Sequence, residues 1–164
     1  MRLSTRGRYA VMAMVELAAR QDRAAKPALG KLIAPVSLSE IAAAQMLSLA
    51  YLEQLFGPLR RAGLVASARG PGGGYRLSRP AEDIAISDIV DAVDEAIRAT
   101  RCDVANEEGG PGCIGGKRCI THDLWAELGE QIRLFLDGVS LRDVVHGEVL
   151  GRATAPQHRQ LTRA

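Results

Sequence analysis

The stretch SLSEIAAAQMLSLAYLEQLFGPLRRAG, residues Ser37–Gly63, decides the fold. Ser37 and Glu40 have the spacing of a capping box, which predicts a short helix starting there. After a tight connection Ser48 can cap a second helix, and Gly63 stands where glycine commonly follows a helix end. The second helix carries an apolar face made of Leu49, Leu52, Leu55, Phe56 and Leu59. Two short helices joined in this way predict a helix-turn-helix.

A glycine-rich turn follows this motif. Residues 64–69 and 75–78 alternate apolar and small side chains, and Gly70-Pro71-Gly72-Gly73-Gly74 stands between them. Two short strands about a glycine turn predict a β-hairpin, which after a helix-turn-helix is a wing. Pro58 is expected to kink the second helix or to confine its regular part to residues 49–57.

Four further helices are expected from apolar residues at helical spacing, over residues 5–20, 88–96, 122–137 and 141–146. Ser87 and Ser140 are the expected caps of the second and the last of these. Residues 21–36 read as a connecting loop. The predicted fold is therefore mainly α with a small β-hairpin wing: a winged helix-turn-helix plus a long dimerisation helix.

Charge is distributed unevenly along the chain, although the net charge is only +2. Residues 1–79 hold 12 Lys and Arg against 4 Asp and Glu, whereas residues 80–151 hold 6 against 15. A basic half beside an acidic half points to a polyanionic partner for the first half only. Because the helix-turn-helix lies in the basic half, we expect that partner to be double-stranded promoter DNA.

The second helix of the motif is the expected recognition helix, whose first exposed residues face base edges in the major groove. Gln54 can pair with adenine, and Glu53 can accept only from cytosine, so that it acts as a filter against other bases. Arg69 adjoins the wing turn, where it can enter a minor groove or hold a phosphate. The full set of expected DNA-binding residues is Arg2, Ala50, Tyr51, Glu53, Gln54, Arg60 and Arg69.

The helix over residues 122–137 has an apolar stripe that is too strong to be left exposed on a thin domain. Its members are Leu124, Leu128, Ile132 and Phe135. The stripe predicts a homodimer with this helix at its interface.

The chain has three cysteines, Cys102, Cys113 and Cys119, and His122 follows the last of them closely. An odd number of cysteines suits a reducing compartment and metal ligation better than a disulfide framework. Thiolates and imidazole bind iron and zinc. The surrounding glycines favour an iron–sulfur cluster over a bare ion, while a structural zinc site or free thiols stay open as alternatives. A nucleophilic Cys119 with His122 as base, as in a thiol oxidoreductase, is disfavoured because no third orienting residue is indicated.

Three parts follow from these patterns: a DNA-binding domain over residues 1–80, a cluster-binding loop and dimerisation helices over residues 81–150, and a disordered tail over residues 151–164. No apolar run is long enough for a membrane span and no signal peptide is recognised, so we expect a cytoplasmic protein without membrane contact.

Several segments resemble the iron–sulfur cluster regulators of the winged-helix family of cluster-sensing repressors. The matching segments are MRLSTRGRYAV (Met1–Val11), YLEQLF (Tyr51–Phe56), GLV (Gly63–Val65), RGPGGGY (Arg69–Tyr75), AVDE (Ala92–Glu95), ATRC (Ala99–Cys102) and CITHDLW (Cys119–Trp125). The wing segment is common to the wider family, whereas the two cysteine-containing segments are more specific to the cluster regulators.

The resemblance implies a homodimeric transcription factor, not an enzyme, with one [2Fe–2S] cluster per subunit. It implies Cys102, Cys113, Cys119 and His122 as the ligands, and the cluster-assembly machinery as the donor of the cluster. Glu53 would discriminate between two classes of promoter site, and Arg69 would reach the minor groove. Repression of the cluster-assembly genes by the cluster-bound form is the expected action. A related repressor that responds to iron or nitric oxide is the alternative.

Two features depart from the family pattern. The spacing from Cys102 to Cys113 is longer than usual because of the insert Val104–Pro111, and the loop Gln21–Pro35 is extended. A smaller departure is Ala50, where a serine is common.

Overall fold

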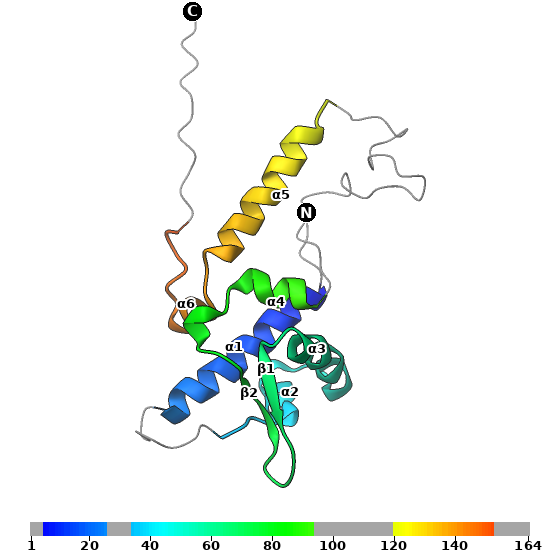
Figure 1. Cartoon of the computed structure of the whole chain (residues 1–164), viewed down its shortest axis with the longest axis vertical. Coiled ribbons are helices and arrows are strands. Elements are labelled where there is room, and N and C mark those ends of the chain that lie inside the picture. The colour runs from blue at the N-terminus through cyan, green and yellow to red at the C-terminus, as the bar shows by residue number, and fades with distance from the viewer. Residues whose placement is uncertain (1–4, 26–33, 94–119, 153–164) are drawn as a thin grey trace, which may run out of the picture.

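The computed structural model describes residues 5–25, 34–93 and 120–152 (Figure 1). In chain order the elements are α1 (Thr5–Ala25), α2 (Leu38–Gln45), α3 (Leu49–Arg61), β1 (Val65–Ala68), β2 (Gly74–Leu77), a short 3₁₀ helix η1 (Ala81–Asp83), α4 (Ile86–Ala92), α5 (His122–Asp137) and α6 (Leu141–His146). The predicted fold class, mainly α with a small hairpin wing, is confirmed.

Helix α1 is the centre of the packing. Its side chains Ala10, Ala13, Met14 and Leu17 are fully buried, and α2, α3, β2, α4 and α6 all contact this helix. The expected end at residue 20 was wrong, because the helix continues to Ala25. Gln21 lies in this extension, where its Oε1 accepts a hydrogen bond from the Leu77 N–H at 3.3 Å. This contact with β2 makes the last turns of α1 part of the fold, so the connecting loop starts later than predicted.

Helices α2 and α3 form the predicted helix-turn-helix. The capping box at Ser37 is present, and the Ser48 side chain accepts from the Tyr51 N–H at 3.2 Å. Gly63 follows the end of α3 with a φ of 72°, the left-handed conformation expected there. The alternative that Pro58 confines the regular part of α3 to residues 49–57 was wrong, because the helix runs to Arg61 with Pro58 buried in it; a kink at Pro58 stays a prediction. The preceding residue is Gly57, which has no Cβ to collide with the proline ring.

The wing is an antiparallel pair in which Val65 faces Leu77 and Ala68 faces Gly74. Each strand is slightly shorter or shifted relative to the expected residues 64–69 and 75–78. Pairing of the wing with a residue outside the two strands was not predicted. Val36 exchanges two backbone hydrogen bonds with Tyr75 of β2, at 2.8 and 2.7 Å. This single bridge attaches the segment before α2 to the wing.

The second half of the chain packs onto the first. Helix α4 begins at Ile86, one residue after Ala85, whose N–H donates to the Asp88 carboxylate at 3.2 Å. The prediction that Ser87 caps this helix was therefore wrong, since Ser87 is buried inside it. Ala85 also forms a β-bridge with Ser140, which joins the start of α4 to the start of α6.

A capping box begins α6, as predicted. The Asp143 carboxylate accepts from the side-chain hydroxyl and the backbone N–H of Ser140, at 2.7 and 2.8 Å. These hydrogen bonds, with a contribution from Arg152, lower the pKa of Asp143 to about 2. Arg152 reaches Asp143 at 2.7 Å and the Gly138 carbonyl at 2.9 Å. The expected tail beyond this point, and the end of the predicted helix 88–96, lie outside the described residues.

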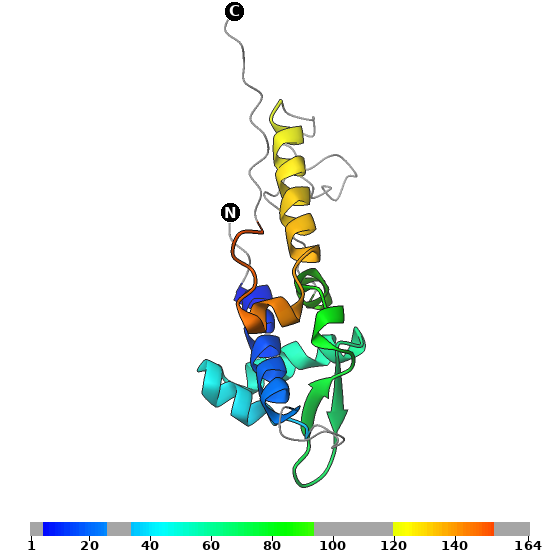
Figure 2. The same ribbon diagram turned by 90° about the vertical axis from the view of Figure 1, so that its left-hand side faces the viewer.

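Helix α5 has the predicted bounds and extends away from the rest of the molecule. Two perpendicular views show it at one end and the wing at the other (Figures 1 and 2). Its contact with the remaining structure is mainly through α4.

We expect Gly74→Ala to destabilise the fold by about 1–3 kcal/mol, the usual scale for forcing an extra group into a packed site. A Cβ at Gly74 would lie 2.3 Å from the Val36 carbonyl oxygen, so the Val36–Tyr75 bridge must open. Gly138→Ala is the matched control, because its Cβ would approach no nearer than 3.4 Å. Urea denaturation gives the free energy of unfolding, and equal values for both variants would contradict the prediction.

Candidate nucleic-acid interface

The start of α3 presents the side chains that were predicted to read DNA. Ala50, Glu53 and Gln54 are exposed, whereas Leu52, Leu55 and Phe56 on the opposite face are buried. The Ser48 cap fixes where this helix begins, and the buried face fixes its rotation. The outward face of α3 therefore carries one acid, one amide and one methyl group in its first two turns.

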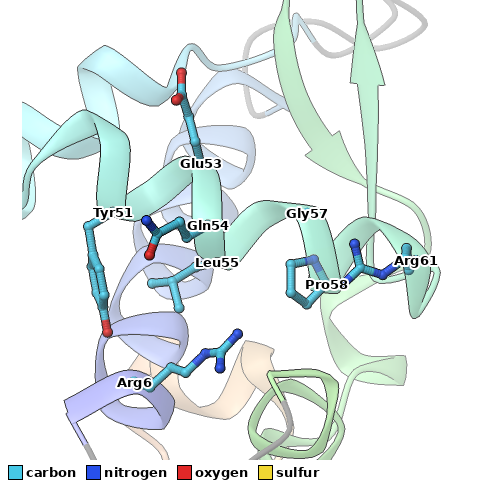
Figure 3. A pocket seen from close by; sticks show the side chains of 8 residues that line it. All are labelled: Arg6, Tyr51, Glu53, Gln54, Leu55, Gly57, Pro58 and Arg61. Carbon is cyan, nitrogen blue, oxygen red and sulfur yellow. The ribbon is translucent and has the colours of Figure 1, made fainter.

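Tyr51 differs from the other predicted reading residues because it is partly buried. Its ring meets the ring of Tyr9 on α1 edge-on, with centroids 5.9 Å apart, and the Arg8 guanidinium lies 5.2 Å from the Tyr9 centroid. Figure 3 shows Tyr51 directed toward α1 and Glu53 directed away from it. Tyr51 thus packs α3 against α1.

Two exposed apolar side chains next to the reading face were not predicted. Met46, in the turn between α2 and α3, is 93% exposed and has a φ of 52°. Leu49, the first residue of α3, is 45% exposed. Apolar side chains can contact the thymine methyl group in a major groove. Helical spacing predicts Leu49 on the apolar inner face of α3. Such a prediction is weakest in the first turn of a helix, where Leu49 lies.

The wing carries exposed arginines at its turn and on β2. Arg69 follows β1 directly and Arg76 lies on β2, and both are exposed. The Tyr75 ring packs on Phe56 of α3 at 4.8 Å between centroids, so the wing is fixed to the recognition helix. Gly70 and Gly72 have φ values of 102° and 78°, which the tight turn after Arg69 requires.

Some basic residues of the first half of the chain bind acidic side chains of the same chain. Arg20 binds Glu16 at 2.6 Å and approaches Glu40 at 3.6 Å, and Gln45 donates to Glu16 at 3.1 Å. These contacts join α1 to α2. Arg60, in contrast, lies exposed in the last turn of α3. The positive charge of the predicted interface is therefore carried by the end of α3 and the wing.

Most of the predicted ligand set lies outside the described residues, namely Cys102, Cys113 and Cys119, and so does Arg2. His122 is described, and it is the first residue of α5. Within residues 5–25, 34–93 and 120–152, no three His, Cys, Asp or Glu side chains are grouped so that they could hold a metal ion.

The residues of the predicted dimer stripe on α5 differ in exposure in the single chain. Leu124 is 60% and Phe135 38% exposed, while Leu128 and Ile132 are half-buried. Leu134, which was not in the predicted set, is 53% exposed. All residues of α5 are described and none is buried, so this helix keeps an apolar surface in the single chain.

No helix in the described part of the chain is long and apolar enough to cross a membrane.

Known proteins resemble this chain over nearly its whole length. It is 42% identical over 163 residues to the HTH-type transcriptional regulator IscR of Klebsiella pneumoniae (strain 342), covering 99% of this chain and 91% of that protein. It is 47% identical over 145 residues to the regulator of the same name in Aliivibrio salmonicida (strain LFI1238), covering 88% of this chain and 77% of that protein. The predicted resemblance to the iron–sulfur cluster regulators is thereby confirmed.

Solved structures agree. The structure of T. potens IscR has a TM-score of 0.66 and 31% identity, over 95% of this chain and 94% of that one. CymR, the global cysteine regulator of B. subtilis, has a TM-score of 0.68 and 31% identity, over 90% of this chain and 98% of that one. The family model Rrf2, described as an iron-dependent transcriptional regulator, matches residues 3–147. The chain therefore belongs to the Rrf2 family of iron-dependent, DNA-binding transcriptional regulators.

Proposed function

We propose that this regulator senses iron–sulfur status: a homodimer binds double-stranded promoter DNA, and a [2Fe–2S] cluster changes which sites it binds. The cluster-bound form represses the genes for cluster assembly, whose products supply its cluster in the cytoplasm. The observation that carries the proposal is the exposed reading face of α3 beside the wing, in a chain with three cysteines between α4 and His122.

Glu53 is the side chain that best explains a choice between sites. It is exposed on the face of α3 that also carries Gln54. A carboxylate in a groove can accept from cytosine but repels phosphate and finds no donor on most other bases. Its main effect is to weaken binding to DNA sites that offer no hydrogen-bond donor to it. Such a side chain excludes wrong sites rather than strengthening binding to the right one.

The donor set fits an iron–sulfur cluster. Three thiolates and one imidazole are the ligand types that iron in such clusters uses, and the mixed set leaves less negative charge than four thiolates. Cys102, Cys113, Cys119 and His122 would hold the cluster, and His122 would supply its imidazole from the first turn of α5. When bound, the cluster supplies a centre whose presence depends on iron and sulfide. The same donors also suit a structural zinc ion, which is the second candidate.

Dimerisation follows from the exposed apolar surface of α5. Leu124, Leu134 and Phe135 are each more than a third exposed on a helix that extends from the molecule (Figure 1). A second copy of α5 would cover this surface. A two-fold dimer also sets two recognition helices about one turn of DNA, or a multiple, apart.

Glu53→Ala should relax the choice of site. We expect it to strengthen binding to fragments with the wrong base by about 1–3 kcal/mol, the scale of one base readout. Arg69→Ala, in comparison, should weaken binding to all good sites, because its contact is lost everywhere. Anisotropy titrations of two promoter fragments measure both effects. The same loss on every fragment for Glu53→Ala would mean that the carboxylate does not select sequence.

Replacement of Cys102, Cys113 or Cys119 by alanine should leave a colourless protein after anaerobic purification, because each removes one thiolate ligand. His122→Cys should keep visible absorbance and lower the reduction potential, since a neutral ligand becomes an anionic one. Iron, sulfide and zinc assays accompany the spectra. A colourless parent protein that contains zinc would favour the zinc alternative, and a Cys102→Ala variant with full iron content would exclude Cys102 as a ligand.

Leu124→Asp combined with Phe135→Asp should give a monomer at micromolar concentration, because two charges would be buried in the apolar contact. Glu130→Lys is the control, as this exposed residue lies on another side of α5. Sedimentation equilibrium distinguishes the two forms. A dimer that persists in the double variant would place the interface elsewhere.

A further inference from the structure

A hollow of about 470 Å³ lies beside α3, on the side that faces the start of α1. It is lined from α1 by Arg6 and from α3 by Gln54, Gly57 and Arg61, among others (Figure 3). The hollow is thus bordered by two helices, one of which is the recognition helix.

One part of the lining of the hollow, at Gly57, is bare backbone. Gly57 has no side chain, and a Cβ built there would lie 3.7 Å from the Arg61 Nη1. The Arg61 guanidinium therefore lies over the glycine rather than away from it. A ligand that enters the hollow can come close to α3 and to this guanidinium at once.

Positive charge dominates the hollow. Arg6 and Arg61 approach it from different helices, and the one acid among its lining residues, Glu53, extends from α3 in the direction away from Arg6 in Figure 3. A guanidinium presents parallel N–H donors that match two phosphate oxygens. Two such groups about one hollow are suited to a single phosphate.

The helices that carry the two arginines pack against each other. The Tyr9 ring on α1 meets the Tyr51 ring on α3, with centroids 5.9 Å apart. Tyr9 lies about one helical turn after Arg6, and Tyr51 lies nearly two turns before Gly57. Gln54 also lines the hollow and lies on the face of α3 that reads bases. A phosphate in the hollow would therefore lie beside the base that Gln54 contacts.

We propose that Arg6 and Arg61 clamp one backbone phosphate of the bound DNA and so fix the position of α3 in the groove. This inference rests on DNA binding through α3, as proposed above. A phosphate contact carries no sequence information, but it positions the side chains that do. The clamp predicts a loss of affinity that is equal on all sequences and that depends on salt.

The test compares Arg6→Gln, Arg61→Gln and the double variant in the full-length protein. Binding to two labelled duplexes, a promoter fragment and an unrelated sequence, is measured over a range of salt concentrations. Each phosphate contact contributes about −0.9 to the slope of log affinity against log salt. We expect the double variant to lose about 0.9 of slope per bound subunit, and about fivefold in affinity per subunit at about 150 mM salt, on both duplexes.

Arg142→Gln is the control, because this exposed arginine lies on α6 and pairs with Glu148 at 3.4 Å. It removes the same charge and should leave the slope unchanged. Circular dichroism confirms that each variant is folded, and methionine, which also removes the charge, replaces glutamine at either position if it is not.

Three results would overturn the clamp. The first is an unchanged salt slope in the double variant. The second is a loss of about 1.8 in slope per subunit, which would mean two separate phosphates. The third is a loss of affinity on only one duplex, which would mean base readout. A parent protein that binds neither duplex would instead refute DNA binding through α3, on which the clamp depends.

Discussion

Helix α1 presents small side chains to five other elements at once. Ala10, Ala13 and Ala18 are buried along it, and Met14 and Leu17 fill the remaining space. Alanines let α3, α4 and α6 approach the α1 backbone closely, so one helix supports both halves of the chain. Because the recognition helix and the second half both pack on α1, a change in the packing of one of them on α1 also alters the packing of the other.

The segment with the three cysteines is bordered by α4, which belongs to this shared core, and by α5, which packs on α4. Helix α4 precedes it and packs on α1, and α5 follows it and packs on α4. Arg79, just after the wing, pairs with Asp88 of α4 at 2.6 Å. Arg133 of α5 lies 3.6 Å from Asp91 of α4. One ion pair thus joins the end of the wing to α4, and a second joins α4 to α5. Exposed ion pairs of this kind each contribute little to stability.

The sequence predicted those parts of the fold that local rules determine. The caps at Ser37 and Ser48, the glycine turn and the bounds of α5 follow from side chains close in sequence. The Val36–Tyr75 bridge was missed because a single pair of residues far apart in the chain leaves no periodic pattern. For α4 the sequence predicts Ser87 as the cap, whereas Ala85 stands at the cap position and the Asp88 carboxylate accepts a hydrogen bond from its N–H.

The candidate site was predictable to a similar extent. Reading residues such as Glu53 and Gln54 follow from helical spacing, because the buried face fixes the exposed one. The hollow at Arg6 was not predictable, since it depends on how α1 crosses α3. The cysteine ligands stay a prediction from donor chemistry and resemblance, because they lie outside the described residues.

The central claim is that the iron–sulfur centre changes the choice of DNA site. The most direct measurement is the ratio of affinities for two classes of promoter fragment, first with the cluster-loaded protein and then after anaerobic removal of iron by a chelator. We predict that the ratio changes on removal and recovers when the cluster is rebuilt, while the protein stays folded and dimeric. An identical ratio in the loaded and the iron-free protein would contradict the account.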